Sequence, residues 1–440
     1  MISIIVLIVV LMIMLAICMM SFQRFLLTPQ FGLIISFLFA LFGCLANAKR
    51  WELQFSDLTI AVVLIGFAAI LSASLFFQYF YRLNKNLDIV VNEKRADIVV
   101  VNEAGIRIWT VVQIINLILV AQFLKTQTGS ATLQFAINAY RNAIFLTQDV
   151  VALPLVTRIT RSMCIYSGYM FLYLLIYNIV FKIKTSLNKY YMINIICATV
   201  TSLLIGGSRG NLLQYLVAGL TIYFALFTFK NNRAFSVKQV IGVLLVMGVF
   251  LLLFGQMSEW LGRGEVDNLS DTIFTYLSGG MVNLDSYLER AVLYSSDKNF
   301  TFTELINTYY RITGQNQLQY RGLLANIYMT KNGFSTGNIY TMFASYYHDG
   351  KILGVFFFSF LMALIGQWLL KLTIVKYESG KINIPMIIYG YMYFDFLQCN
   401  FSNRFYSQFF ADNMIKFIIF LLIFRFFLTT NVVKVKVSRF

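Results

Sequence analysis

Residues 2–20 have the sequence ISIIVLIVVLMIMLAICMM, which contains no charged side chain. An apolar run of this length is close to the roughly 20 residues that an α-helix needs to cross a bilayer core about 30 Å thick. The run lacks the basic start and the convincing cleavage site of a secretory signal peptide. We therefore expect residues 2–20 to remain in the protein as a membrane-spanning helix.

The composition of the whole chain is that of a membrane protein. Hydrophobic residues make up 59% of the 440 residues and charged residues 12%, whereas soluble proteins average about 25% charged residues. A soluble chain of this size would have too little polar surface to cover its core. The composition thus excludes a soluble enzyme, a nucleic-acid-binding domain and a disordered chain. The five cysteines show no metal-binding or disulfide spacing.

Ten further apolar segments resemble residues 2–20. The sequence therefore predicts an all-α fold, a polytopic integral membrane helical bundle with about 11 (10–13) transmembrane helices. The other predicted spans are residues 31–48, 58–81, 106–123, 162–181, 190–207, 211–229, 239–256, 352–375, 383–398 and 413–430.

Basic residues in the connecting segments predict the orientation of the bundle. The chain has 35 Lys and Arg against 19 Asp and Glu, a net charge of +16, and lysine and arginine favour cytoplasmic loops. Five basic segments fall on one side of the predicted bundle, which we assign as cytoplasmic, with the N-terminus outside. Lys49 and Arg50 fall on the opposite side and depart from the pattern. The five segments are residues 82–107, 182–189, 230–238, 371–381 and the tail at 434–439.

Three parts of the chain differ in character. Residues 1–256 are predicted to be an N-terminal transmembrane bundle, in which the polar segment 131–157 forms an interfacial helix on the outer side. Residues 257–337 form a large, partly helical extracytoplasmic loop, with eight acidic against six basic residues and many tyrosines. Residues 338–440 contain the C-terminal transmembrane helices and the basic cytoplasmic tail.

Arg209 has the most unusual setting of any charge in the sequence. It lies in the stretch GGSRGN at 206–211, between two apolar segments with almost no loop. An arginine at membrane depth costs roughly 2.5–3.5 kcal/mol, so it usually faces a cavity or a partner. The flanking glycines allow close backbone approach, and the start of the following helix favours an anion. These features indicate a phosphate-binding residue; the alternative is an arginine that snorkels from a tight turn.

Three side chains are candidates for proton transfer. His348 is the only histidine, and it lies beside Asp349 in the stretch YYHDG at 346–350, before the predicted helix 352–375. Asp285 lies in the large outer loop. A histidine or a carboxylate can accept a proton from a hydroxyl group, and the sequence does not choose among the three. The alternative for His348 is an interfacial residue with no chemical role.

The outer loop also carries candidate binding residues. Arg290 and Arg311 could hold phosphate, although a base near acids in a loop is usually a solvated pair. Arg321 adjoins the polar run that includes Gln315 and Asn316, and we expect these three residues near a glycan. The loop also mixes tyrosines with amide and acidic side chains, a combination that suits a carbohydrate, because sugar rings stack on aromatic rings and form hydrogen bonds at their edges. The alternative is that the tyrosines belong to an interfacial aromatic belt. The sequence contains no nucleotide-binding loop and no spacing typical of a metal site, so we expect no cofactor and no metal.

Three stretches together resemble one family. They are IGGSRGNLLQYL at 205–216, TYLSGGMVNLDSYL at 275–288 and STGNIYTMFASYYHDGKILGV at 335–355. In this order, separated by a large outer loop, they resemble the oligosaccharide repeat-unit polymerases, also called the Wzy or O-antigen polymerase family.

The resemblance implies a membrane glycosyltransferase of the GT-C-like type. Such an enzyme joins undecaprenyl-pyrophosphate-linked oligosaccharide repeat units, of O-antigen or capsule, by block transfer at the outer face of the bacterial cytoplasmic (inner) membrane. The expected partners are this lipid-linked oligosaccharide as donor and acceptor, membrane lipids and a chain-length regulator protein, with no nucleic acid. Such a reaction needs a base for the acceptor hydroxyl, and His348, Asp349 or Asp285 could serve. It also needs positive charge at the leaving diphosphate, which Arg209 with a loop arginine could supply. The functional histidine of the related ligases lies near the end of the large loop, and His348 comes about ten residues later.

Other classes of protein remain open at this point. An O-antigen ligase would transfer the finished glycan to another acceptor. A lipid-linked oligosaccharide flippase or transporter would show charges at the membrane midplane and repeated halves, whereas most charges here lie at the ends of the predicted spans. A non-catalytic membrane scaffold would tolerate replacement of Arg209.

Overall fold

The computed structural model describes residues 1–21, 27–81, 97–143, 152–205, 209–231, 269–290, 300–315, 328–330, 332–337 and 339–429. Within these ranges the chain is helical apart from one two-stranded hairpin and the connecting loops. The predicted all-α class is thereby confirmed for the part of the chain that the structure describes. The predicted span 239–256 and the basic tail lie outside the described residues.

Seven of the described helices are long and apolar enough to cross a membrane. They coincide with seven of the eleven predicted spans, and three further predicted spans form helices that are shorter or more highly charged. The multi-pass helical architecture is therefore supported with seven candidate spans. The seven are α1 (Ile2–Ser21), α2 (Pro29–Ala46), α3 (Asp57–Tyr81), α5 (Glu103–Thr128), α7 (Leu155–Phe181), α9 (Arg209–Asn231) and α13 (Met342–Val375). The other three are α8 (Asn188–Leu204), α14 (Ile384–Leu397) and α16 (Asp412–Thr429).

The chain divides into two compact units. Unit 1 comprises Met1–Asp88, Asp267–Ile374 and Met392–Ile415. Unit 2 comprises Ile89–Val266, Val375–Tyr391 and Lys416–Phe440. Each unit is thus assembled from segments that are far apart in the sequence.

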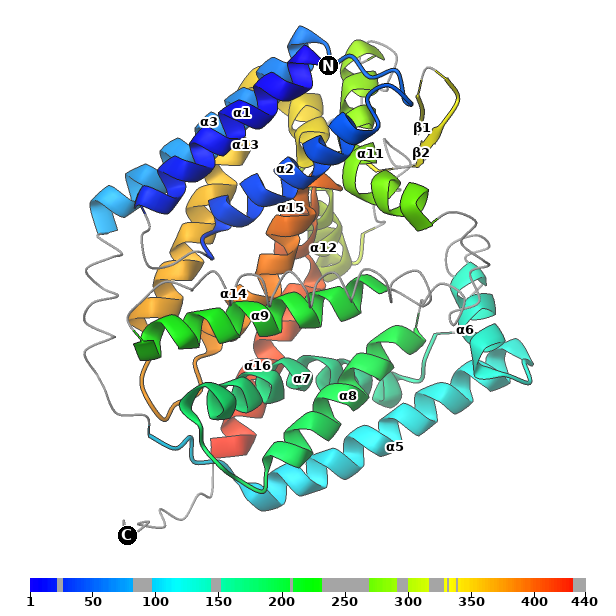
Figure 1. Ribbon diagram of the computed structural model, residues 1–440. Helices are drawn as coiled ribbons and strands as arrows, with labels where there is room; N and C mark the ends of the chain where they lie inside the picture. The colour runs from blue at the N-terminus through cyan, green and yellow to red at the C-terminus, as the bar shows by residue number, and fades with distance from the viewer. Residues whose placement is uncertain are drawn as a thin grey trace. The chain divides into compact units, whose positions relative to one another are not determined.

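In unit 1, α1 packs on α2 and α3, and α2 packs on α11 (Leu269–Arg290) (Figure 1). The local sequence fixes the start of α2, because Pro29 occupies its first turn and the Thr28 hydroxyl accepts a hydrogen bond from the Phe31 amide at 3.4 Å. The remaining elements are short. They are α12 (Thr303–Thr313), the antiparallel strands β1 (Tyr328–Met329) and β2 (Ser335–Gly337), the 3-10 helix η4 (Gln398–Asn400) and α15 (Arg404–Phe409).

In unit 2, α7 packs on α8 and α9, and α5 packs on α8 and on α6 (Leu133–Asn142). An apolar cluster fills the space between α5 and α6, and Leu204 at the end of α8 joins it. The helix α6 lies within the segment 131–157, which we predicted to be one interfacial helix, but residues 155–157 already belong to α7. Residues 144–151 of that segment lie outside the described part of the chain.

Polar contacts bring several predicted cytoplasmic segments to one end of unit 2. The Tyr177 hydroxyl donates to the Asp97 carbonyl at 2.8 Å, and the Asp97 amide donates to the Ser379 hydroxyl at 2.8 Å. The Lys230 ammonium donates to the Val180 carbonyl at 2.5 Å. The described ends of four of the five basic segments therefore share one end of this unit, as the charge pattern requires.

The helix α13 is broken near its start. Gly350 and Lys351 have non-helical backbone angles, and Lys351 has φ 51° and ψ −143°. A side-chain-bearing residue in such a region costs about 1–3 kcal/mol of backbone strain. Beyond the break, Gly354 approaches the Tyr346 carbonyl oxygen so closely that a β-carbon at this position would collide with it. The predicted span 352–375 is thus the part of α13 that follows the break.

Candidate functional site

The helix α11 distributes polar side chains to two opposite sides. Asn283 and Tyr287 are four residues apart and share one face, whereas Asp285 is about 200° away from Asn283 around the helix. All three belong to the stretch 275–288 that carries part of the family resemblance. Their contacts define what each side of α11 does.

Asp285 caps the start of α3. One of its carboxylate oxygens accepts hydrogen bonds from the Ser56 amide at 2.9 Å, the Ser56 hydroxyl at 2.9 Å and the Thr59 hydroxyl at 2.6 Å. A carboxylate at a helix N-terminus is stabilised by the free amides there. The contacts of this predicted catalytic residue are therefore those of a helix cap.

Asn283 fixes the chain that leads into α13. Its amide nitrogen donates to the Gly337 carbonyl at 3.0 Å and to the Ile339 carbonyl at 2.7 Å. Its amide oxygen accepts a hydrogen bond from the Thr336 hydroxyl. Asn283 is buried, so these bonds satisfy groups that water does not reach.

Tyr287 contacts the only histidine. Its hydroxyl oxygen lies 2.7 Å from Nδ1 of His348. Tyr287 is 1% exposed, whereas His348 is partly exposed. The Phe300 ring packs edge-on against the imidazole, with ring centroids 4.2 Å apart. The imidazole is therefore held from two sides at the last turn before the break in α13.

Asp349 holds the loop that carries Phe300. One carboxylate oxygen accepts a hydrogen bond from the Phe300 amide at 3.0 Å, and the other accepts one from the Thr301 amide at 2.7 Å. The Asn403 side chain donates to the Thr301 carbonyl at 3.0 Å. Residues 300–301 thus connect the His348–Asp349 pair to the turn that precedes α15.

Arg404 follows Asn403 and contacts a carboxylate that our sequence analysis did not single out. Nε of Arg404 lies 3.3 Å from Oδ1 of Asp395, which is 0% exposed. The signal for this pair was present in the sequence. Asp395 interrupts the apolar run 384–397, and an acidic residue in such a run usually pairs with a base or marks a functional site.

The predicted binding residues of the outer loop have different surroundings. Arg311 forms ion pairs with Glu304 at 3.1 Å and Asp412 at 3.0 Å, so two carboxylates of the chain already balance its charge. Gln315 is exposed. The side chain of Arg290 and the whole of Asn316 and Arg321 lie outside the described part of the structure.

Arg209 belongs to unit 2, whereas the candidates above belong to unit 1. It is the first residue of α9 and is 6% exposed. Two residues later, the Asn211 side chain donates to the Ser202 carbonyl in α8 at 3.3 Å. The glycines and serine at 206–208 lie outside the described residues. The buried position agrees with the expectation that Arg209 faces a partner or a cavity.

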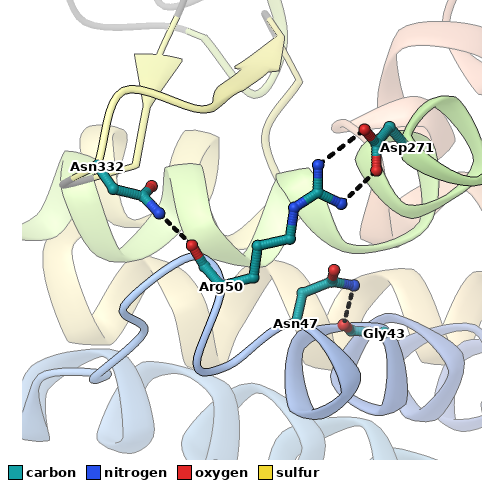
Figure 2. A network of polar contacts seen from close by, with 5 residues as sticks. All are labelled: Gly43, Asn47, Arg50, Asp271 and Asn332. Atoms are coloured by element: carbon teal, nitrogen blue, oxygen red, sulfur yellow. Dashed lines mark hydrogen bonds and ion pairs between the residues drawn. The ribbon is translucent and has the colours of Figure 1, made fainter. Parts of the chain in front are cut away.

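A network around Arg50 ties three segments of unit 1 together (Figure 2). Its guanidinium binds both carboxylate oxygens of Asp271 at the start of α11, with Nη2 to Oδ2 at 2.8 Å. Its backbone carbonyl accepts a hydrogen bond from Asn332 in the hairpin turn. Next to it, Trp51 stacks on Phe334 with ring centroids 5.1 Å apart. The hairpin and α11 are thus fastened to the loop after α2.

The same network gives a physical reason for the exception in the charge pattern. The predicted topology puts Arg50 on the side opposite to the other basic segments, and in the structure Asp271 neutralises it. The guanidinium holds the pKa of Asp271 below its usual value of 3.8 by donating hydrogen bonds to the carboxylate. The contact also places residues 47–56 and the start of α11 at the same end of unit 1, as the predicted topology requires.

The described fold and site define a multi-pass helical membrane protein. Comparison of the chain with known protein families, characterised proteins and solved structures finds no match. Within the described ranges, no cluster of three or more histidine, cysteine, aspartate or glutamate side chains has a metal-binding arrangement.

Proposed function

We propose that this protein is a polysaccharide polymerase of the bacterial cytoplasmic membrane, with its active site on the outer face. It joins undecaprenyl-pyrophosphate-linked oligosaccharide repeat units by block transfer. The observation that carries the proposal is the pairing of Tyr287 with His348 across two of the stretches that resemble the polymerase family. The pair lies beside the strained backbone of Lys351, and such strain is common at active sites.

The reaction needs a base for the acceptor. A sugar hydroxyl of the incoming repeat unit attacks the anomeric carbon of the growing glycan, and the bond from that carbon to the pyrophosphate oxygen breaks. Undecaprenyl pyrophosphate leaves with the bonding electron pair, and the hydroxyl proton passes to the base. A positioned histidine is suited to this transfer near neutral pH.

Contacts favour His348 over the two carboxylates as that base. Both oxygens of Asp349 and one oxygen of Asp285 accept hydrogen bonds that hold backbone segments. If Nδ1 of His348 donates its proton to the Tyr287 oxygen, Nε2 carries the lone pair and can accept the hydroxyl proton. Tyr287 then acts as a positioning residue that selects the tautomer.

Arg209 is proposed to stabilise the departing pyrophosphate. Charge develops on the leaving phosphate oxygens, and a fixed guanidinium near them lowers the barrier. Arg209 is the first residue of α9, so the partial positive charge of the helix N-terminus lies beside the guanidinium and also favours an anion. This assignment rests on the burial of Arg209 at the start of α9 and on the resemblance of residues 205–216.

A deletion strain tests the proposal. Loss of a polymerase leaves single repeat units attached to the acceptor, whereas loss of a ligase leaves no attached glycan and loss of a flippase stops export of the lipid-linked unit. We expect single attached units, and a ladder of longer chains after complementation with the wild-type chain. Absence of all attached glycan would contradict the polymerase assignment.

A further inference from the structure

The Asp395–Arg404 pair combines a fully buried acid with an accessible base. Asp395 is 0% exposed, and neither of its carboxylate oxygens has a well-formed hydrogen bond within the described part of the chain. Its nearest charge is Nε of Arg404 at 3.3 Å. A buried carboxylate with so little compensation strongly favours a charged partner beside it. Asp395 therefore holds the Arg404 guanidinium in place.

The guanidinium of Arg404 is only partly covered. The Arg404 side chain is 36% exposed, and the ion pair found for it among the described residues is made by Nε. Arg311 shows the contrasting case in the same unit, because two carboxylates surround it. Within the described part of the chain, Arg404 thus turns Nε to a buried acid and leaves its two terminal nitrogens for a ligand.

This geometry suits an anion with several oxygens. Two parallel N–H groups of a guanidinium match two oxygens of a phosphate, and an arginine fixed from behind loses little freedom when it binds. The neighbouring turn is also fixed, because Asn403 binds the Thr301 carbonyl and the carbonyl of Asn400 leaves no room for a β-carbon at Gly280. The site lies one segment away from His348 through residues 300–301.

We propose that Arg404, oriented by Asp395, binds a phosphate group. Asp395 is a positioning residue in this site, and Arg404 makes the contact. The inference deepens the proposed function, since a lipid-linked phosphate is the substrate class expected there, and it adds a binding residue that the sequence analysis did not include. The same chemistry would also accept free phosphate, so the source of the phosphate is part of the test.

Binding is measured on the purified full-length protein in phosphatidylcholine nanodiscs. The probes are inorganic pyrophosphate in solution and a polyprenyl phosphate doped into the nanodisc, and the readout is the shift of Tm with probe concentration. We expect saturable stabilisation of the wild type by at least one probe. Stabilisation by the polyprenyl phosphate alone identifies a lipid source, and stabilisation by both shows that the phosphate group suffices. Stabilisation by neither overturns the proposal.

Variants connect the binding to the pair. Arg404→Lys keeps the charge but loses the fork, and we expect its apparent Kd to rise at least about tenfold. Arg404→Ala alone leaves Asp395 buried without a partner and is expected to fold poorly. The double variant Asp395→Asn/Arg404→Gln removes both charges together, so it should fold while it binds the probes at least about tenfold more weakly.

Arg107→Gln is the matched control. Arg107 is an exposed arginine paired with Glu103 on α5, and its replacement should leave the Kd unchanged. A wild-type Kd for both Arg404→Lys and the double variant would show that the pair is structural only, and would refute the inference.

The glycan ladder separates this result from the proposed function. A normal ladder from an Arg404→Lys strain, together with unchanged binding, refutes the phosphate site and leaves the polymerase assignment standing. The opposite combination is weaker phosphate binding by the Arg404→Lys protein together with normal polymerisation in the deletion strain. In that case the phosphate site stands and the polymerase assignment fails.

Discussion

Removing the hydroxyl of Tyr287 tests whether His348 is the base, because that hydroxyl is the group that orients the imidazole. In Tyr287→Phe the ring that packs on Tyr340 remains, with ring centroids 6.4 Å apart in the wild type. The variant loses the 2.7 Å contact with Nδ1. The substitution is thus nearly isosteric, and the expected change comes from one hydrogen bond.

The magnitude follows from that bond. A typical intramolecular hydrogen bond contributes about 0.5–1.5 kcal/mol, and 1.4 kcal/mol corresponds to about a tenfold change in rate. Loss of the orienting bond should therefore slow glycan extension about 2- to 12-fold. His348→Ala removes the base itself and should slow extension about 100-fold or more. Because Tyr287 acts through His348, the double variant should be as slow as His348→Ala and no slower.

The assay is extension of a lipid-linked repeat unit by purified protein, with the variants compared at equal membrane-protein concentration. Thermal unfolding of each variant controls for loss of fold. A wild-type rate for Tyr287→Phe would refute the positioning role. A double variant that is several-fold slower than His348→Ala would show that Tyr287 acts independently of the histidine.

Three further predictions concern other parts of the chain. Arg209→Ala should abolish chain extension while the protein still inserts. Arg209→Lys should give a shortened glycan ladder, because lysine keeps the charge but loses the two-pronged geometry of the guanidinium. A full ladder from Arg209→Ala would support the alternative that Arg209 is a snorkelling arginine without a phosphate-binding role. Arg50→Gln should lower Tm at neutral pH, because it removes the partner that depresses the pKa of Asp271. The stability that comes from a depressed pKa is present above the unfolded pKa of 3.8 and is lost as the pH falls through the folded pKa of Asp271. The difference in Tm between wild type and Arg50→Gln should therefore vanish below the folded pKa. A difference that persists in acid would exclude the ion pair as its cause. Single cysteines at position 300 and at Lys371 should label from opposite sides of the membrane, position 300 from outside intact cells and Lys371 only after permeabilisation. The reverse result would overturn the orientation.

Hydropathy was sufficient to predict where the long described helices lie. Residues 58–81 were predicted as a span, and α3 covers Asp57–Tyr81, because a long apolar run has no stable alternative in lipid. The segment 383–398 was also predicted, and α14 covers Ile384–Leu397. With 14 residues this helix is shorter than the roughly 20 residues that a straight crossing needs.

The sequence allowed candidate residues to be chosen where a polar side chain stands out among its neighbours in the chain. It did not allow their contacts with residues far away in the chain to be predicted. His348 and Asp349 stand out in the sequence because they are polar groups at the start of an apolar run. Their partners Tyr287 and Phe300 are 61 and 49 residues away, and no spacing rule connects them. Asp285 was predicted as a catalytic candidate by its charge, whereas its contacts with the start of α3 are visible only in three dimensions.

The close approach of Gly354 to the Tyr346 carbonyl limits how this helix can evolve. The neighbouring Leu353 is 80% exposed, so its replacement by another apolar residue should not disturb the packing of the protein. At position 354 even alanine, which is just as compatible with lipid, would force the two parts of α13 apart. Two adjacent residues of the same apolar run therefore have different structural requirements, hydrophobicity alone at position 353 and the absence of a side chain at position 354.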